Sequence, residues 1–459
     1  MRKIRFVRVG ALFFLALLLG PAASRSTLAQ PNVPPPDFAY WTGDTTDVRA
    51  QPQGGVCLMG GARENDAAIE WFLRRAGGGD VVVLRASGAD GYNSYFFDNF
   101  PQARVHSVLT LVVNSREVAL DPYVARQLRR AEAVWIAGGD QGNYVRYWKD
   151  TPLHEALRHL LANTPAVFGG TSAGCAILGN GYFAALNNTV NSPQALRDPF
   201  DSRVTLGAND LLVAPPLRRL LTDTHFDNPD RRGRLAVFLA RLGAPPLAPA
   251  EPYFKGLGVE EFTAVVVEPN GLARVFGGFP AKEDFAWFVA PACAPGLGPE
   301  VLQAGQPLTW DRDGRAFTVY KVAGTPTGSA PFDLRTFTPG AGSAGSWEYW
   351  SVRNGELSTG RAAPAFAECA GALAVLPAGP AATALVRQQG RTITALPHSG
   401  GMSASATIRL ELRDTQGRLL RRASLPPDSA VAWPELPMGI YLLKAARGRQ
   451  VQQQRIIFE

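Results

Sequence analysis

Cysteine and histidine are both scarce in this sequence. Its 459 residues include four cysteines and five histidines, with no C-x-x-C pair and no cluster of the two residue types. This scarcity argues against a structural zinc site, which needs four such ligands close together. His154 and His159 enclose the stretch "HEALRH", but a spacing of five places them about 140° apart on a helix, so they cannot clamp one metal. They are expected to be surface or capping residues, and the sequence predicts no metal and no other cofactor.

The four cysteines do not define a disulfide framework. Cys57 lies in an apolar stretch and Cys175 lies in a run of small apolar residues, so both are expected to be buried thiols. Cys293 and Cys369 flank a later region and could pair if the chain is exported, although three connectivities are formally open. Whether that pair forms is left open.

Runs of basic residues are also lacking. The formal net charge is +7, but the lysines and arginines are spread along the chain without a run of five or six. A nucleic-acid-binding protein concentrates its positive charge on one face or segment, so no nucleic-acid partner is predicted.

Apolar runs long enough to cross a membrane are absent as well. The apolar run "ALFFLALLLG" follows a basic start that contains Arg2, Lys3, Arg5 and Arg8. It is shorter than the roughly 18–20 residues of a membrane span, and it has the pattern of a secretory signal peptide. We assign residues 1–29 to this peptide, with cleavage after Ala29 or alternatively after Ala23, and expect an exported chain without a transmembrane segment.

The rest of the chain divides by composition. A Pro-rich linker is expected at residues 30–51, a large domain at 52–358, a linker rich in Ala, Pro and Gly at 359–382, and a small β-sandwich at 383–459. In the large domain, apolar stretches such as "VCLM", "VVVL" and "AVWI" alternate with amphipathic helical patterns, the longest predicted over residues 144–163. This alternation predicts an α/β fold with a mainly parallel sheet flanked by helices.

Glycine pairs mark the ends of three predicted strands. They are Gly60-Gly61, Gly138-Gly139 and Gly169-Gly170. Since ligands bind at the carboxyl ends of strands in an open parallel sheet, these pairs are expected to surround one crevice.

The third pair opens the stretch "GGTSAGCAIL", which follows the predicted strand Ala166–Phe168. The pattern Gly170-x-Ser172-x-Gly174 is that of a nucleophile elbow, a tight turn between strand and helix that exposes a reactive serine. A glycine-rich bend without catalytic function has the same composition, so the pattern alone leaves both interpretations open.

A serine nucleophile needs a base and an acid that orients the base. His225 is the best candidate base because it ends an apolar run and has polar neighbours, whereas His106 and His398 are expected to be exposed. Residues 175–250 contain no glutamate, so the acid is sought downstream, where Glu260 and Glu261 precede an apolar strand. Adjacent residues there should point opposite ways, one into the crevice and one into solvent. The order Ser172, His225, Glu261 differs from that of α/β-hydrolases.

These residues resemble the cyanophycinase and aspartyl-dipeptidase family of serine peptidases over roughly residues 54–355. The resemblance is carried by four motifs in order: "GGDQ" at Gly138–Gln141, "GTSAG" at Gly170–Gly174, "DTHF" with "RRGRL" within Asp223–Leu235, and "GLGVEE" at Gly256–Glu261. It implies a fold like the class I glutamine amidotransferases, with serine in place of their cysteine, and a triad of Ser172, His225 and Glu261.

The resemblance also implies how a substrate is held. The backbone N–H groups of Gly139 and Ala173 would form an oxyanion hole, and the matching substrate-binding positions are Gln141, Asp223, Arg231 and Arg234. The substrate of the family is a storage polymer that is cut after its β-aspartyl-arginine units. Two positions depart from the pattern, because Thr224 stands in place of a glutamine and Pro229 in place of an arginine. The prediction of a peptidase is therefore supported by more residues than the prediction that its substrate is cyanophycin.

The C-terminal stretch "LPMGIYLLKAARGRQVQQQRIIFE" resembles the sorting domains of proteins exported by the type IX secretion system of Bacteroidetes. This resemblance implies the secretion machinery as a partner and a secreted or surface-attached enzyme, with a C-terminal domain that export can remove.

Two other functions compete with a secreted serine peptidase. A catalytically silent surface protein of the same fold could bind anionic peptides or glycans through Arg231 and Arg234. A cysteine-dependent amidotransferase would use Cys175, three residues past the elbow serine. The sequence leaves the natural substrate and the oligomeric state open, a homodimer included.

Overall fold

The computed structural model describes residues 35–244, 247, 254–291 and 298–364, and, beyond these, 386–389, 392–395, 407–413, 419–426, 429–433, 436, 439–447 and 450–458. The chain forms two compact units, Met1–Cys369 and Ala370–Glu459. Residues 1–29, which were assigned to a signal peptide, lie outside the described residues, as do Cys293, Cys369 and His398.

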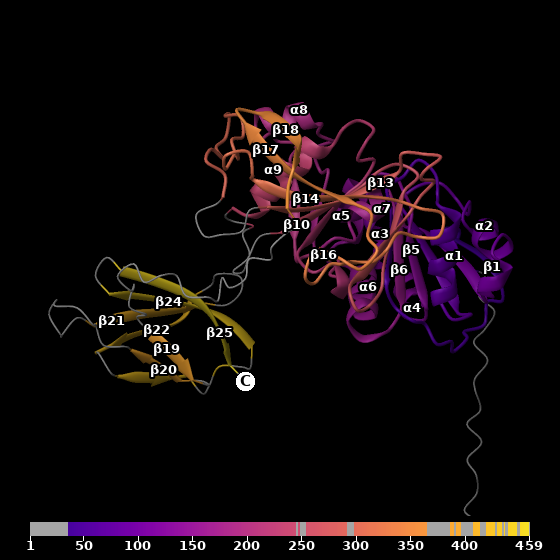
Figure 1. Cartoon of the computed structure of the whole chain (residues 1–459). Helices are drawn as coiled ribbons and strands as arrows, with labels where there is room; N and C mark the ends of the chain where they lie inside the picture. Colours follow the sequence, from indigo (N-terminus) through magenta and orange to yellow (C-terminus); the bar gives the residue numbers. More distant parts are fainter. Residues whose placement is uncertain are drawn as a thin grey trace, which may run out of the picture. The chain divides into compact units, whose positions relative to one another are not determined.

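A ten-stranded sheet forms the centre of the first unit (Figure 1). Its strand order is β1-β4-β3-β5-β6-β2-β11-β12-β15-β16, and the neighbours from β4 to β2 are parallel, whereas the outer strands pair antiparallel. The strands are β1 (Ala39–Gly43), β2 (Val56–Met59), β3 (Asp80–Arg85), β4 (Ser107–Val112), β5 (Ala133–Ile136), β6 (Val167–Thr171), β11 (Ala264–Val267), β12 (Leu272–Phe276), β15 (Phe332–Asp333) and β16 (Thr338–Pro339).

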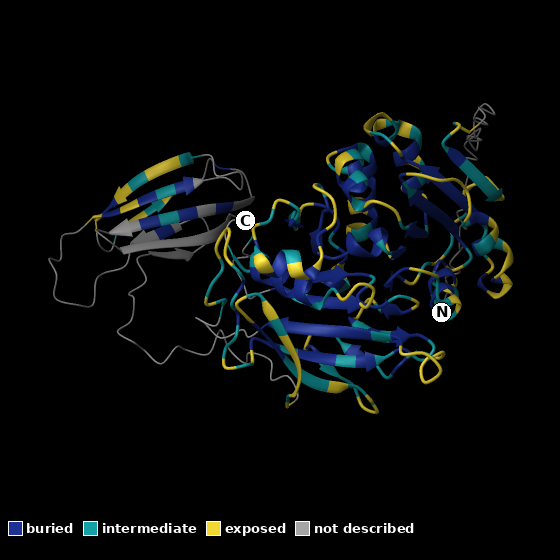
Figure 2. Cartoon of the chain, turned by 90° about the horizontal axis from the view of Figure 1, so that it is seen from above, coloured by how far each residue is buried: buried dark blue, intermediate teal, exposed yellow. Residues whose placement is uncertain are grey.

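Helices cover both faces of the parallel strands. Successive side chains of a strand point to opposite faces, so Cys57 of β2 packs with α1 and α2 while Leu58 packs with α3 to α6. The helices are α1 (Asp66–Arg75), α2 (Asn93–Asp98), η1 (Pro101–Ala103), α3 (Arg116–Leu120), α4 (Pro122–Leu128), α5 (Gln141–Trp148), α6 (Pro152–Asn163), α7 (Ala173–Ala176), α8 (Ser192–Arg197), η2 (Pro215–Leu217) and α9 (Arg232–Leu242). Figure 2 shows these strands buried between helices whose outer faces are exposed. The predicted α/β fold with flanking helices is confirmed.

An eight-stranded sheet completes the first unit. Its order is β18-β17-β14-β13-β10-β9-β7-β8; one face shares a core with the large sheet and the other is covered by α8 and α9. The strands are β7 (Gly181–Phe183), β8 (Leu206–Ala208), β9 (Leu220–Asp223), β10 (Lys255–Val259), β13 (Phe285–Pro291), β14 (Phe317–Ala323), β17 (Ser346–Arg353) and β18 (Glu356–Ala362). Since β9 pairs in parallel with β10, the residues that follow these two strands emerge side by side.

The second unit is made of two antiparallel sheets around a common core of apolar side chains. The sheets are β19 (Val386–Gln389), β20 (Thr392–Ala395) and β23 (Ala430–Ala432), and β21 (Ile408–Arg413), β22 (Leu419–Leu425), β24 (Gly439–Arg447) and β25 (Gln450–Phe458). Ile393 of one sheet and Leu410 of the other both belong to that core, as in a small β-sandwich.

Several local expectations were wrong. Strand β1 lies within the segment expected to be a linker and pairs with β4. The long helix predicted over residues 144–163 is two helices, because Pro152 begins α6 with Thr151 as its N-cap. The helix after the elbow spans only Ala173–Ala176. In the described part of the chain, no helix combines the length and apolar character needed to span a bilayer.

Candidate active site

A pocket of about 300 Å³ lies at the carboxyl ends of the parallel strands. Three glycine pairs were predicted to surround a crevice. Gly61 and Gly138, from two of these pairs, line the pocket, and the third pair lies in β6, which ends at the pocket. The lining residues are Gly61, Ala62, Glu64, Arg85, Tyr92, Ala137, Gly138, Thr171, Ser172 and His225.

Ser172 occupies a strained turn between β6 and α7. Its φ of 51° and ψ of −116° are unusual for a residue with a side chain. The turn is tight because a Cβ on Gly174 would lie 2.0 Å from the backbone oxygen of Ile136, and one on Gly170 would lie 2.7 Å from the carbonyl carbon of Gly174. The strand, sharp turn and helix predicted from the sequence are present, with the geometry of a nucleophile elbow.

Three side chains from separate segments meet in one chain of hydrogen bonds. Ser172 Oγ lies 2.8 Å from His225 Nε2, and His225 Nδ1 lies 2.6 Å from Glu261 Oε1. The second oxygen of Glu261 accepts a hydrogen bond from Asn228 Nδ2 at 3.3 Å, and its backbone N–H donates to Asp227 Oδ1. The structure thus brings together the serine, histidine and glutamate predicted from the sequence, and adds Asn228 and Asp227 as groups that orient the glutamate.

Charge at Glu261 sets the direction of these hydrogen bonds. The hydrogen bond from His225 holds the pKa of Glu261 below its ordinary value, and Asn228 lowers it further. An ionised carboxylate can only accept, so His225 Nδ1 donates to it, and Nε2 is left to accept the hydroxyl proton of Ser172. This is the tautomer that general-base catalysis requires.

The Gly60-Gly61 turn after β2 fixes the histidine. His225 has a φ of 46°, and its backbone N–H donates to the carbonyl oxygen of Gly60 at 2.8 Å. Gly61 has a φ of +117°, and a Cβ at this position would lie 2.4 Å from His225 Nε2. The imidazole therefore packs directly on backbone that only glycine can provide.

A methyl group at Gly61 is therefore expected to displace the imidazole of His225. Gly61→Ala should lower the turnover rate about 100-fold or more, because a shift of roughly 1 Å in a reacting group has an effect of that size. The control is Gly91→Ala, since a Cβ at Gly91 meets nothing within 4 Å. The rate of reaction with a fluorophosphonate reports the loss of serine reactivity. The free energy of unfolding, measured on the same proteins, shows whether that loss comes from a destabilised fold. A Gly61→Ala protein as reactive as the parent would contradict this packing.

The amides predicted for the oxyanion hole lie beside the serine. Ala173 is the first residue of α7, and a Cβ on Gly138, which precedes Gly139, would lie 3.5 Å from Ser172 Cβ. Among the described residues, neither the Gly139 nor the Ala173 amide has an intramolecular acceptor. The buried Tyr144 hydroxyl lies 2.9 Å from the oxygen of Ala137 and 3.0 Å from that of Gly138, so α5 holds this turn in place.

Two of the four predicted substrate-binding residues pair with each other. Arg234 donates to both carboxylate oxygens of Asp223, through Nε at 2.9 Å and through Nη2, and their side chains are only 3% and 2% exposed. Arg234 also donates to the oxygen of Val190 at 3.1 Å. Neither residue lines the pocket around Ser172. Their pairing joins α9 to β9, two residues before His225, and their contact with a substrate stays a prediction.

Arg231 and Gln141 are the other two candidates. Arg231 donates to the oxygen of Thr224 at 2.8 Å, and its buried Nε has no hydrogen-bond partner. Burial, with the neighbouring Arg234, lowers the pKa of Arg231 to about 10, so it stays charged at neutral pH. Gln141 begins α5 and is partly exposed. Neither residue lines the pocket around Ser172, and their contact with a substrate stays a prediction.

Glu260, the neighbour of Glu261 that was expected to face solvent, is buried. It is only 7% exposed and accepts hydrogen bonds from Trp287 Nε1 at 2.7 Å and Phe285 N at 2.8 Å. The expectation that it faces solvent was wrong, because both glutamates lie in the turn after β10, where Trp287 of β13 covers Glu260. Burial raises the pKa of Glu260 to about 7.

This raised pKa predicts a pH dependence of stability. Between an unfolded pKa near 4.5 and a folded pKa of about 7, the folded protein keeps a proton that the unfolded chain has lost. The free energy of unfolding should therefore fall as pH rises through that window. Urea unfolding of the parent and Glu260→Gln at pH 5, 6, 7 and 8 tests this: the difference between them should change across the window. A difference that is constant with pH would contradict it.

Three charged or polar residues of the pocket were missed from the sequence: Glu64, Arg85 and Tyr92. Glu64 follows the first glycine pair by three residues and Arg85 ends β3. Polar side chains just after buried parallel strands are the signal that could have found the first two. Tyr92 comes from the loop before α2, where no comparable pattern marks it.

Other reactive side chains lie outside this arrangement. His154 was expected at the surface or at a cap, and it is buried, with Nδ1 accepting from Asp150 N and Nε2 lying 2.7 Å from Leu211 O. His159 is exposed. Cys57 and Cys175 are buried free thiols, as predicted, and burial raises the pKa of Cys175 far above its ordinary value. That environment argues against Cys175 as a nucleophile. Across the part of the chain that is described, no three His, Cys, Asp or Glu side chains form a potential metal site.

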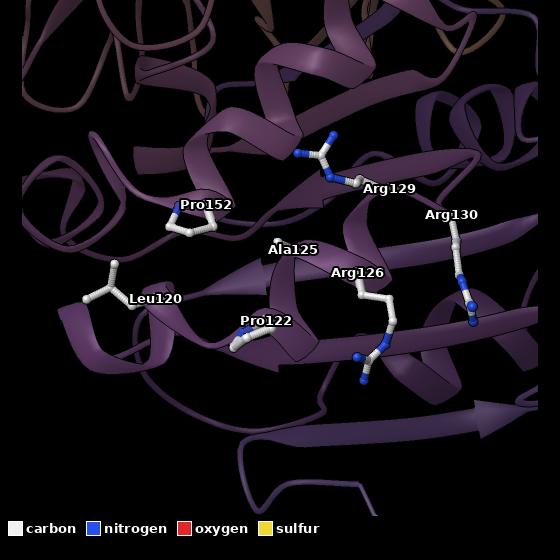
Figure 3. A pocket seen from close by; sticks show the side chains of 7 residues that line it. All are labelled: Leu120, Pro122, Ala125, Arg126, Arg129, Arg130 and Pro152. Atoms are coloured by element: carbon white, nitrogen blue, oxygen red, sulfur yellow. The ribbon is translucent and has the colours of Figure 1, made fainter. Parts of the chain in front are cut away.

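A second pocket, of about 410 Å³, lies along α4 and the start of α6 (Figure 3). Its apolar side chains lie beside three arginines; the lining residues are Leu120, Pro122, Ala125, Arg126, Arg129, Arg130 and Pro152. None of the predicted site residues takes part.

Comparison with known proteins identifies the family. A cyanophycinase of Synechococcus elongatus is 30% identical over 240 residues, which are 51% of this chain and 68% of that relative. The chain belongs to the cyanophycinase family. A cyanophycinase of Trichormus variabilis is 26% identical over 229 residues, 48% of this chain and 70% of the relative. No family model matches.

Among solved structures, a peptidase from an acI-B1 Actinobacterium matches with 17% identity and a TM-score of 0.35, covering 50% of this chain and 90% of its own. Membership in the cyanophycinase family confirms the resemblance found in the sequence and supports the broad prediction of a peptidase. The sorting domain, the triad roles and the substrate stay predictions.

Proposed function

We propose that this cyanophycinase-family protein is a serine peptidase that hydrolyses aspartyl or isoaspartyl peptides through an acyl-enzyme. The observation that carries the proposal is the continuous hydrogen-bonded chain from Ser172 through His225 to Glu261. A hydroxyl, an imidazole and a carboxylate in this order form the constellation that activates serine on several unrelated folds.

The proposed reaction has two stages. Ser172 Oγ forms a bond to the substrate carbonyl carbon while His225 Nε2 takes its proton, and the same proton passes to the leaving amine as the C–N bond breaks. Water then attacks the ester, His225 takes a proton from that water, and it returns a proton to Ser172 Oγ as the ester bond breaks. The amides of Gly139 and Ala173 are proposed to stabilise the oxyanion of both tetrahedral intermediates.

For the substrate we propose a peptide in which aspartate supplies the cleaved carbonyl. Cyanophycin is the first candidate because of the family relationship. The local departures, Thr224 and Pro229, lie on either side of His225 in the chain, so a pocket rebuilt for another aspartyl peptide is the alternative outcome of the test below.

Export and surface display are proposed on the sequence resemblances alone. The basic, apolar N-terminal segment and the C-terminal stretch similar to type IX sorting domains support a secreted or surface-attached enzyme. The separate core of the C-terminal unit is compatible with a domain that export removes.

The test is release of β-aspartyl-arginine from purified cyanophycin by the full chain and by Ser172→Ala. Release that depends on Ser172 is the expected result. No release from cyanophycin, together with Ser172-dependent cleavage of other β- or α-aspartyl peptides, would keep the peptidase and change its substrate. Equal hydrolysis of such a panel by parent and Ser172→Ala would overturn the proposal and favour a protein that only binds peptides.

A further inference from the structure

The pocket that contains Ser172 and His225 also holds two opposite charges. Glu64 follows the Gly60-Gly61 turn and Arg85 ends β3, and both line the same pocket as Ser172. Among the described residues, no ion pair joins them and neither has another charged partner within 4 Å. Each charge is therefore left with neutral partners only.

Backbone carbonyl groups of the following loop hold Arg85 in place. Its Nε donates to the oxygen of Ser87 and its Nη1 to that of Ala89, both at 2.5 Å. A Cβ on Gly88, whose φ is +85°, would lie 2.3 Å from Arg85 Nη2, so the guanidinium wraps closely around this loop. A guanidinium has five N–H donors, and the neutral carbonyl contacts leave several of them and the full positive charge for a ligand.

Glu64 is oriented by one neutral donor. The hydroxyl of Tyr92 donates to Glu64 Oε1, and Tyr92 itself packs against Phe96 and Trp135 with ring centroids 5.1 and 6.1 Å away. Burial and the nearby carboxylate raise the pKa of Tyr92, so the phenol stays a donor. The other oxygen of Glu64 has no protein partner in the described residues and can accept from a cationic ligand group.

We propose that Glu64 and Arg85 form a charge-selective subsite that binds a zwitterionic portion of the peptide substrate, Glu64 taking an amine or guanidinium and Arg85 a carboxylate. The proposal rests on the proposed function, since it treats the pocket beside Ser172 as the place where the peptide lies. It adds to the predicted substrate-binding residues two side chains that line the pocket itself.

Binding of small ligands to the full chain carrying Ser172→Ala tests the subsite without turnover. The reference ligand is β-aspartyl-arginine, and four analogues each lack one ionic group. β-Aspartyl-citrulline has no guanidinium charge, succinyl-arginine lacks the amine, β-alanyl-arginine lacks the aspartyl carboxylate, and β-aspartyl-agmatine lacks the arginine carboxylate. Calorimetry should show weaker binding by about 10- to 100-fold for one cation-deleted and one carboxylate-deleted analogue, the size expected for a charged hydrogen bond. The affected analogue identifies which group each residue binds.

The variants assign these losses to residues. In Glu64→Gln the penalty for the cation-deleted analogue should disappear, and in Arg85→Gln the penalty for the carboxylate-deleted analogue should disappear. Glu70→Gln and Arg74→Gln, which remove the two charges of an exposed ion pair on α1, should change neither. Unchanged selectivity in the Glu64 and Arg85 variants, or no binding of any of the five ligands, would overturn the subsite. Loss of serine reactivity in the parent chain, measured separately with a fluorophosphonate, would overturn the proposed function instead.

Discussion

Replacing His225 by glutamine is expected to lower the turnover rate by about 10⁴-fold or more while the protein remains folded. The imidazole is the group within 2.8 Å of Ser172 Oγ, and glutamine cannot take the hydroxyl proton at neutral pH. Removal of the base from a serine triad has effects of this size because the remaining residues no longer activate the serine. Glu261→Gln should have a smaller effect, roughly 10²- to 10⁴-fold, since it leaves the base present but poorly oriented.

The matched control is His159→Gln, because His159 is exposed on α6 and takes no part in the site. It should release β-aspartyl products, or react with a fluorophosphonate, as fast as the parent. Urea unfolding of all three variants shows whether the fold is kept. A folded His225→Gln protein within tenfold of the parent rate would contradict the assigned role of the histidine.

Of the variants discussed, Arg234→Met is expected to lower the free energy of unfolding the most. It leaves Asp223 buried without its partner, at a side-chain exposure of 2%, and breaking a buried ion pair on one side costs about 3–5 kcal/mol. The control is Arg203→Met, whose pair with Asp201 is 34% and 20% exposed and should contribute at most about 1 kcal/mol. Tryptophan fluorescence in urea reports mainly on the first unit, which holds eight of the nine tryptophans.

The double variant Asp223→Leu with Arg234→Met separates the pair from the individual charges. Since no charge is then left alone in the core, it should recover part of the stability lost in Arg234→Met. A double variant that is less stable than Arg234→Met, or an Arg234→Met protein as stable as Arg203→Met, would show that the pair does not join β9 to α9 as inferred.

The reactive part of the site could be predicted because its signals are local. The elbow around Ser172 depends on glycines within two residues of it, and the position of His225 depends on the end of one apolar strand. The glutamate pair at positions 260 and 261 could be found because residues 175–250 contain no glutamate. The family resemblance supported the choice of Glu261, which reaches His225 across two parallel strands, β9 and β10.

The parts that were missed depend on contacts between distant segments. The buried pair of Asp223 and Arg234 could not be foreseen, because the sequence motifs show the two charges but not that they face each other in the core. Glu260 was expected at the surface because nothing near it in the chain reveals that Trp287 covers it. The break between α5 and α6 was also missed, although Thr151 and Pro152, an N-cap and a first helical residue, mark it in the sequence itself.

The most direct test of the central claim is the mass of the intact chain after reaction with a fluorophosphonate, with the site of modification located by peptide mapping. Activation of Ser172 by His225 predicts a single adduct on Ser172, absent from Ser172→Ala, formed far more slowly in His225→Gln and formed normally in Cys175→Ala. A parent chain that never reacts, or an adduct of the same size on Ser172→Ala, would contradict it.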